Sequence, residues 1–330
     1  MINFPYQKIL IVRLSSLGDI LLTTPLIRSL KKVYPTIEIH FLLREEYQDL
    51  LIHNPNVSKL ITIKREDPNS KTRDILSKYK YDFVFDLQNN LRSRVLTHGL
   101  HCRKVRFKKL SWQKFLLVKL KLNMLRNALS IPKRYASVIK GLELDNEGLE
   151  LYTKENQSES LSGVTNIIGF CPGSRHFTKM WPKEYFIELG KILIDNGFNI
   201  VLFGGKDDLQ LCGEIKSNLT KCIDLSNDNI ILQTAANMKL CKAIICNDSG
   251  LMHTACAVGV PVIAIFGSTV KEFGFFPFGC KHLVLENKSL SCRPCSHIGK
   301  SHCPKKHFNC MREIKPQFVF NSLQNFLKEK

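Results

Sequence analysis

The first part of the chain alternates short, continuous apolar runs with longer stretches in which apolar residues recur at helical spacing. The runs KILIVRL (8–14), IEIHFLL (37–43), KLITIK (59–64) and YDFVFDLQ (81–88) are rich in β-branched and aromatic residues, which is typical of buried strands. Between them, the stretches at 20–35, 44–55 and 70–80 predict helical connections. Strands that alternate with helices predict a parallel sheet with crossover helices.

The same alternation restarts after a polar stretch at residues 152–166. Apolar runs at 166–173, 198–205, 242–250 and 260–269 alternate with amphipathic stretches, so the pattern predicts a second sheet of the same kind. A chain of 330 residues has the length of two ordinary domains. We therefore expect an α/β protein with two doubly wound, Rossmann-like parallel-sheet domains, at residues 1–155 and 156–330.

Charge is distributed unevenly along this chain, which has 48 Lys and Arg against 29 Asp and Glu and a net charge of +19. Between Leu87 and Leu142 there is no acidic residue, whereas Lys and Arg recur throughout. Such a segment attracts nucleic acid, an anionic membrane surface or a phosphorylated substrate, unless it is only a solvated face. The N-terminus lacks the pattern of an export signal, so we expect a cytoplasmic protein.

Two loops after expected strands have the composition of anion sites. In NDSGLMH, Ser249 and Gly250 open a helix whose free N–H groups and dipole favour a diphosphate, although an Asp-Ser helix cap explains the same residues. In CPGSRHFTKMWP, Ser174 lies in a tight turn, and Arg175 and Lys179 supply cations.

A third loop, FGGKDD, offers Asp207 or Asp208 to a ribose hydroxyl. None of these loops fits the P-loop or the G-x-G-x-x-G fingerprint, which disfavours an NTPase or a dehydrogenase. The three loops together therefore predict the binding of a nucleotide diphosphate by the second domain.

A resemblance to a known family rests on three motifs: VRLSSLGDILLTTPLIRSLKKVYP, PGSRHFTKMWP and NDSGLMHTACAVGVPVIAIFGST. In this order and spacing they resemble the ADP-heptose lipopolysaccharide heptosyltransferases of glycosyltransferase family 9. The resemblance implies a GT-B fold, with two Rossmann-like domains facing across a cleft, and an inverting transfer that needs no metal cofactor. It implies ADP-L-glycero-D-manno-heptose as donor and the phosphorylated inner core on lipid A as acceptor. A family member that uses another nucleotide sugar or acceptor is the alternative.

The resemblance also implies roles for individual residues. Asp19 matches the catalytic base of the family, and Lys179 and Asp248 match residues at the donor. Ser174, Ser249 and Gly250 are placed near the diphosphate, while the choice between Asp207 and Asp208 for the ribose stays open. An inverting transfer needs one base for the acceptor hydroxyl and cations for the leaving diphosphate, which agrees with this assignment.

The basic segment then suits an acceptor that carries phosphate and a lipid anchor. We expect Lys104, Arg106, Lys108 and Lys109 to bind this acceptor, with peripheral contact at the cytoplasmic face of the inner membrane. No nucleic-acid-binding motif accompanies the charge, so we expect no nucleic-acid partner.

A cysteine cluster at residues 292–310 contains Cys292, Cys295, Cys303 and Cys310. The C-x-x-C spacing of the first two suits a structural zinc site with four thiolate ligands. Free or redox-active thiols are the alternative, because a second C-x-x-C is missing. In either case we expect the cluster to lie outside the catalytic mechanism.

Overall fold

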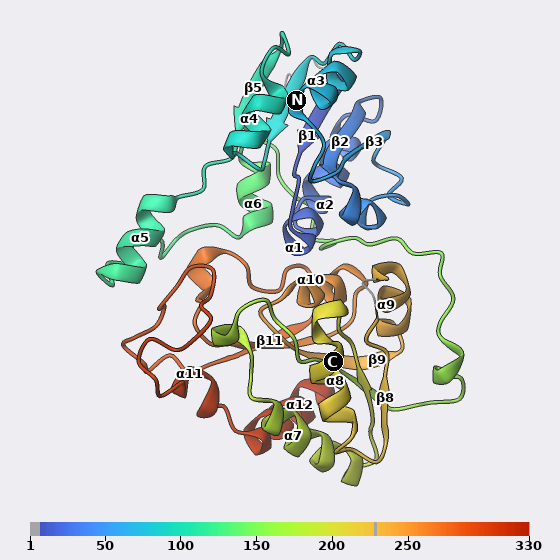
Figure 1. The fold of residues 1–330 in the computed structure, drawn as a ribbon, viewed down its shortest axis with the longest axis vertical. Coiled ribbons are helices and arrows are strands. Elements are labelled where there is room, and N and C mark those ends of the chain that lie inside the picture. Colours follow the sequence, from blue (N-terminus) through green and yellow to red (C-terminus); the bar gives the residue numbers. More distant parts are fainter. Residues whose placement is uncertain (1–6, 228–229, 330) are drawn as a thin grey trace. The chain divides into compact units, whose positions relative to one another are not determined.

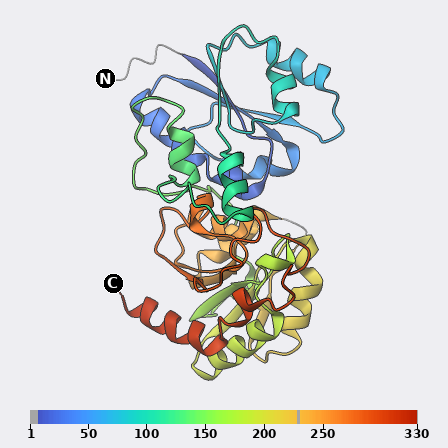
Figure 2. The same ribbon diagram turned by 90° about the vertical axis from the view of Figure 1, so that its left-hand side faces the viewer.

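The computed structural model describes residues 7–227 and 230–329 and divides into two compact units, each built on a parallel sheet (Figures 1 and 2). The first unit comprises Met1–Leu110 with Leu129–Tyr152, and the second comprises Ser111–Ala128 with Thr153–Lys330. This grouping differs from the expected division at residue 155, because Ser111–Ala128 packs with the second unit. Among its contacts there, Lys121 Nζ donates to the Pro294 carbonyl at 2.7 Å.

The sheet of the first unit has five parallel strands in the order β3-β2-β1-β4-β5. Helices α3 and α4 pack on the face that carries Leu10 and Val12. Helices α2 and α6 contact one another. The elements are β1 (Lys8–Val12), α1 (Leu17–Leu21), α2 (Thr24–Val33), β2 (Glu38–Arg44), η1 (Glu45–Leu50), β3 (Lys59–Ile63), α3 (Asn69–Ser77), β4 (Phe83–Asp86), α4 (Leu91–Thr97), β5 (Arg103–Arg106) and α6 (Ile131–Ala136).

The helix expected at residues 20–35 is two helices, α1 and α2. The break has a local cause, because Pro25 has no N–H to donate to the Leu21 carbonyl one turn earlier. The hydroxyl of Thr24 donates to that carbonyl instead, at 2.8 Å. The break ends α1 after five residues, so Asp19 lies in a short helix directly after β1.

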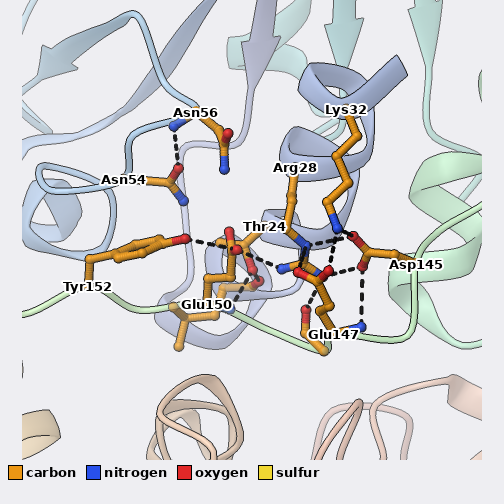
Figure 3. A network of polar contacts seen from close by, with 11 residues as sticks. Thr24, Arg28, Lys32, Asn54, Asn56, Asp145, Glu147, Glu150 and Tyr152 are labelled. Carbon is orange, nitrogen blue, oxygen red and sulfur yellow. Dashed lines mark hydrogen bonds and ion pairs between the residues drawn. The ribbon is translucent and has the colours of Figure 1, made fainter. Parts of the chain in front are cut away.

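An ion-pair network fastens the end of the first unit to α2 (Figure 3). The buried Arg28 donates through Nε to Asp145 at 2.8 Å, and its Nη1 lies 2.8 Å from the Glu150 carboxylate. Lys32 Nζ adds a contact to Asp145 at 2.7 Å, and Tyr152 donates to Glu150 at 2.9 Å. The Arg28 guanidinium holds the pKa of Asp145 far below its ordinary value. These contacts connect the last residues of the first unit, up to Tyr152, to helix α2.

The sheet of the second unit has six parallel strands in the order β11-β10-β9-β6-β7-β8. Its strands are β6 (Ile167–Cys171), β7 (Asn199–Leu202), β8 (Cys222–Asp224), β9 (Cys241–Asn247), β10 (Val262–Phe266) and β11 (His282–Glu286). Its helices are α5 (Ser111–Lys119), η2 (Glu159–Leu161), η3 (Phe177–Lys179), α7 (Lys183–Asp195), η4 (Lys206–Asp208), α8 (Leu209–Lys216), α9 (Ile231–Met238), α10 (Gly250–Ala257), η5 (Lys271–Phe273), α11 (Asn309–Arg312) and α12 (Pro316–Lys328).

One face of this second sheet is covered by α7, α8 and α12, whose apolar residues share a core with the strands. That core contains Phe186 of α7, Cys212 of α8 and Val319 of α12. It also contains Ile168 of β6 and Ile245 of β9. Helix α12, the red helix that ends at C in Figure 2, packs against α7. In both units the loops that leave the carboxyl ends of neighbouring strands gather at one edge of the sheet, which is where ligands bind in this class of fold.

Candidate active site

Asp19 lies at the carboxyl edge of the first sheet, in the first turn of α1. Its Oδ2 atom accepts a hydrogen bond from the Ser16 hydroxyl at 2.9 Å and one from the Ser16 backbone N–H at 3.3 Å. Asp19 therefore does cap the helix, as the sequence allowed.

Arg13, the residue after β1, adds an ion pair to the same oxygen. Its Nη2 lies 2.8 Å from Asp19 Oδ2, while its Nη1 donates to the Leu87 carbonyl at 2.8 Å. The contacts from Ser16 and Arg13 all reach Oδ2, and none of them uses Oδ1. The carboxylate is thus anchored through Oδ2, and the Asp19 side chain keeps 20% of its surface exposed.

Sequence reasoning missed Arg13, although a signal for it exists. A cation directly after an apolar strand is buried by the fold and needs an acidic partner. Arg13 is only 8% exposed, and Asp19 is that partner.

The next strands bring further charge to this edge. Asp86, at the end of β4, is buried and accepts from Asn89 N at 2.7 Å and from the Ser93 hydroxyl at 2.9 Å. Arg106 Nε, at the end of β5, lies 3.8 Å from Asp86 Oδ2. Burial and the nearby Arg13 guanidinium lower the pKa of Lys109. The charges of Arg13, Asp86 and Lys109 thus act on one another.

The four residues expected at the acceptor are not equivalent. Lys104 Nζ donates to the Leu100 carbonyl, so this lysine is committed to its own strand end. Lys108 has an exposed side chain. The other two lie at the same sheet edge as Asp19. The Asp19 charge acts on Lys109, and Arg106 pairs with Asp86.

Two expected donor residues meet in the second unit. Lys179, in η3, places its Nζ atom 2.7 Å from Oδ2 of Asp248, which directly follows β9. The Thr269 hydroxyl donates to the same Oδ2 at 2.7 Å. Asp248 keeps only 7% of its side-chain surface exposed, so this carboxylate is committed to orienting a lysine.

Asn247 joins the loop after β6 to the end of β9 and was not expected from the sequence. Its side-chain NH₂ donates to the Pro172 carbonyl at 2.7 Å, and its side-chain oxygen accepts from Trp181 N at 2.9 Å. The Ser174 hydroxyl adds a bond to the Asp248 carbonyl at 3.2 Å. The loops after β6 and β9 are therefore held together, each expected to bind one part of a diphosphate.

The start of α10 completes this group. Ser249 precedes the first residue, Gly250, with an extended backbone. The Ser249 hydroxyl oxygen is buried and has no hydrogen-bond partner in residues 7–227 and 230–329. A buried hydroxyl without a partner beside free helix N–H groups suits an anionic ligand. Arg175, in contrast, has an exposed side chain.

The structure distinguishes the two aspartates of the third loop. Asp208 accepts from Gly205 N at 3.0 Å and lies against Gly173, where a Cβ atom would collide with its carboxylate. Burial raises the pKa of Asp208 above its ordinary value. Asp207 is exposed. Asp208 is thus occupied in packing two loops together.

The structure does not support the zinc site expected at the cysteine cluster. In the part of the chain that it describes, no group of three or more His, Cys, Asp or Glu side chains is arranged to hold a metal ion. Burial raises the pKa of Cys310 to about 12 and also raises that of Cys295. In this arrangement both thiols are therefore protonated at neutral pH.

The segment around these cysteines instead braces the loops that contain Thr178 and Thr269. The Lys300 carbonyl accepts from Thr178 N at 3.1 Å, and Lys300 N donates to the Thr178 hydroxyl at 2.8 Å. The guanidinium of Arg293 donates to the Thr269 carbonyl at 2.9 Å and pairs with Glu286 at 2.8 Å. Thr178 precedes Lys179, and Thr269 bonds Asp248, so the segment supports both members of that ion pair.

No helix among the described residues is both long enough and apolar enough to cross a membrane.

This chain is similar to known proteins along most of its length. Lipopolysaccharide heptosyltransferase 2 of Escherichia coli is 28% identical over 299 residues, which cover 81% of this chain and 84% of the relative. The crystal structure of a family 9 glycosyl transferase from Veillonella parvula superposes with a TM-score of 0.80 at 24% identity, covering 98% of both chains. The structure of the E. coli ADP-heptose lipopolysaccharide heptosyltransferase II superposes with a TM-score of 0.75 at 25% identity, covering 97% of this chain and 98% of the other.

The expected fold is confirmed by these superpositions, since two parallel-sheet α/β units match the GT-B architecture of the heptosyltransferase structures. The model of glycosyltransferase family 9 (heptosyltransferase) matches residues 70–306, most of the chain. The protein therefore belongs to glycosyltransferase family 9, the heptosyltransferase family.

Proposed function

We propose that this glycosyltransferase moves a heptose from ADP-L-glycero-D-manno-heptose to the inner core of lipopolysaccharide, with inversion at the anomeric carbon. The names of its relatives support this donor and acceptor. The observation that carries the chemistry is the Asp19 carboxylate, which is anchored through Oδ2 and belongs to a side chain that is 20% exposed. Asp19 belongs to the first unit, and the residues proposed to bind the diphosphate belong to the second.

Asp19 acts as the general base in this proposal. Oδ1 takes the proton of the acceptor hydroxyl while the anomeric carbon develops oxocarbenium character. Arg13 positions the carboxylate, because its Nη2 atom forms an ion pair with Oδ2 of Asp19 at 2.8 Å.

Lys179, Ser174, Ser249 and Gly250 bind the diphosphate. The Lys179 ammonium, held by Asp248, and the N–H groups at the start of α10 neutralise the charge that develops on the leaving ADP. These groups stabilise the leaving charge in the way that a metal ion does in other transferases, so the proposed transfer needs no metal. Arg175 is an outer cation, and Asp207 is the ribose-binding acid because Asp208 is occupied by Gly205.

The acceptor is the phosphorylated inner core on lipid A. Lys109 and Arg106 bind its phosphates at the Asp19 edge, Lys108 adds an exposed charge, and Lys104 contributes least. Since this acceptor is anchored in lipid, the proposal includes peripheral contact with the cytoplasmic face of the inner membrane and no nucleic-acid partner.

A transfer assay against a panel of nucleotide sugars and truncated lipopolysaccharides tests this proposal. We expect product only with an ADP-heptose and a phosphorylated inner-core acceptor, and NMR of the product should show the inverted anomer. Transfer from another nucleotide sugar at a higher kcat/KM would move the protein to a different branch of the family. Binding of nucleic acid without any sugar transfer would contradict the proposal altogether.

A further inference from the structure

Residues 111–128, named here the α5 segment, carry a concentration of exposed apolar side chains. Trp112 is 66% exposed and Phe115 is 48% exposed, and their rings stack with centroids 5.6 Å apart. Leu120, Leu122 and Met124 follow with exposures of 58%, 55% and 66%. Water-exposed apolar side chains that gather in this way mark a surface for a membrane or a partner.

The α5 segment is nevertheless held firmly to the second unit. Leu117 and Leu125 are buried, and Lys121 Nζ donates to the Cys292 carbonyl at 3.0 Å. Asn123 donates to Glu272 at 3.0 Å. These contacts hold the segment in place, so its exposed apolar residues belong to the surface of the folded unit.

The charge on this segment selects between the possible occupants. Lys119 and Arg126 are exposed among the apolar residues, and the sequence has no acid from Leu87 to Leu142. Protein interfaces are depleted of lysine at their cores, whereas interfacial membrane segments combine tryptophan, leucine and basic residues. Tryptophan also favours the boundary between lipid headgroups and acyl chains.

We propose that the α5 segment is a membrane-docking element that inserts Trp112 and Phe115 into the headgroup region of a bilayer containing anionic lipids. Leu120, Leu122 and Met124 extend the inserted surface, and Lys119 and Arg126 contact the lipid phosphates. This inference rests on the proposed function and deepens it. An enzyme whose acceptor is anchored in lipid meets that acceptor at a membrane.

Tryptophan fluorescence of the full-length protein tests the insertion directly. The chain has 2 tryptophans, and Trp181 is only 1% exposed, so a change in emission on adding lipid reports on Trp112. Vesicles of phosphatidylcholine and phosphatidylglycerol in equal parts should shift the emission to the blue and protect it from iodide quenching. Vesicles of phosphatidylcholine alone, or anionic vesicles in high salt, should give a much smaller change, because surface charge is screened by salt.

A matched pair of variants identifies the surface. The triple variant Phe115→Ser, Leu120→Ser, Met124→Ser keeps the reporter Trp112 and should lower partition into anionic vesicles by about tenfold or more, since each buried methylene favours the membrane. The control Phe318→Ser removes a 55% exposed phenylalanine from α12 and should leave partition unchanged. Equal thermal melting of wild type and both variants shows that folding is intact.

Two results would contradict the proposed docking element. One is that the wild-type protein does not bind anionic vesicles, and the other is that the triple variant binds them as strongly as the wild type. Self-association that the triple variant abolishes, seen by sedimentation in the absence of lipid, would assign the surface to a second copy instead. Transfer to a lipid-free inner-core oligosaccharide is measured in parallel. Transfer without vesicle binding contradicts this inference alone, whereas vesicle binding without transfer contradicts the proposed function alone.

Discussion

The carboxyl edges of the two sheets each carry a key aspartate, and the two are held in different ways. Asp19 in the first unit is 20% exposed and has all its contacts to Arg13 and Ser16 on one oxygen. Asp248 in the second unit is 7% exposed and bonds both Lys179 and Thr269. An open carboxylate can accept a proton, whereas a buried and paired one orients a cation. In the proposed mechanism, an aspartate is therefore the base in the first unit, and another aspartate orients a donor-binding lysine in the second.

The difference extends to the groups around each aspartate. Asp19 is surrounded by side-chain charges, with Lys109 and Arg106 at the same edge. Asp248 lies beside backbone N–H groups and the buried Ser249 hydroxyl at the start of α10. We therefore expect substitutions in the first unit to change the rate of transfer or the affinity for acceptor, and substitutions in the second to change the affinity for donor.

The largest effect is expected for Asp19→Asn. The amide keeps the shape of the side chain but cannot act as a base, so kcat should fall by about two to four orders of magnitude. Steady-state kinetics at saturating donor measure this loss. Ser16→Ala is the matched control, because it removes a helix-cap contact of Asp19 and should cost about 1 kcal/mol of stability with little change in kcat. Equal losses of kcat in the two variants would reduce Asp19 to a helix cap.

A smaller loss is expected for Lys179→Ala. A charged hydrogen bond contributes roughly 1.5–3 kcal/mol, so the Kd for ADP should rise and kcat/KM should fall by about one to two orders of magnitude. Calorimetric titration with ADP measures the first change. The control Arg175→Ala removes an exposed cation from the same loop and should change the Kd much less. If the two variants bind ADP equally well, the donor site has been placed on the wrong residue.

The paired substitutions Asp207→Ala and Asp208→Ala compare a free acid with a packed one. Asp207→Ala should weaken ADP binding several-fold at unchanged stability, because a single hydrogen bond to the ribose is lost, about 1 kcal/mol. Asp208→Ala should lower thermal stability by a similar free energy, since Gly205 N loses its acceptor. ADP titration and thermal melting of both variants separate the two roles, and the opposite pattern would exchange them.

The smallest effect is expected for single lysines near the acceptor. Lys109→Ala should raise the KM for the phosphorylated acceptor a few-fold at low salt, and the difference should shrink as salt screens the charge over about 8 Å. Lys104→Ala serves as the control, because its ammonium is already bonded to the Leu100 carbonyl. Acceptor KM values at several salt concentrations provide the measurement. Similar KM values for both variants at every salt concentration would make this part of the basic segment a solvated surface.

The sequence pattern predicts the sheets well because buried parallel strands are continuous apolar runs, as in β1, β6 and β10. It misses β5, whose four residues RKVR include three cations. Such an edge strand is identified by its pairing with β4 and not by its composition. The sequence pattern also places the α5 segment in the first domain, whereas it packs with the second unit. The reason is that its contacts are distant in sequence: Lys121 bonds Cys292, which lies 171 positions later.

At the site, residue types at strand ends indicate the aspartates but not their partners. Arg13, Asn247 and Arg293 act through backbone carbonyls and buried ion pairs that only the folded chain brings into reach. The C-x-x-C spacing suggested zinc, but spacing along the chain does not determine whether four thiols converge. The hydrogen bond from Lys300 N to the Thr178 hydroxyl shows instead that this segment braces the loop that contains Lys179.

The decisive measurement is single-turnover transfer at saturating donor, with the donor Kd determined in parallel, for Asp19→Asn and Lys179→Ala. We predict that Asp19→Asn binds ADP like the wild type and transfers heptose about two to four orders of magnitude more slowly. Of the two variants, Lys179→Ala should bind ADP more weakly. Wild-type transfer by Asp19→Asn at saturating donor, or a donor Kd that rises as much in Asp19→Asn as in Lys179→Ala, would contradict the assignment of the base to the first unit and the donor site to the second.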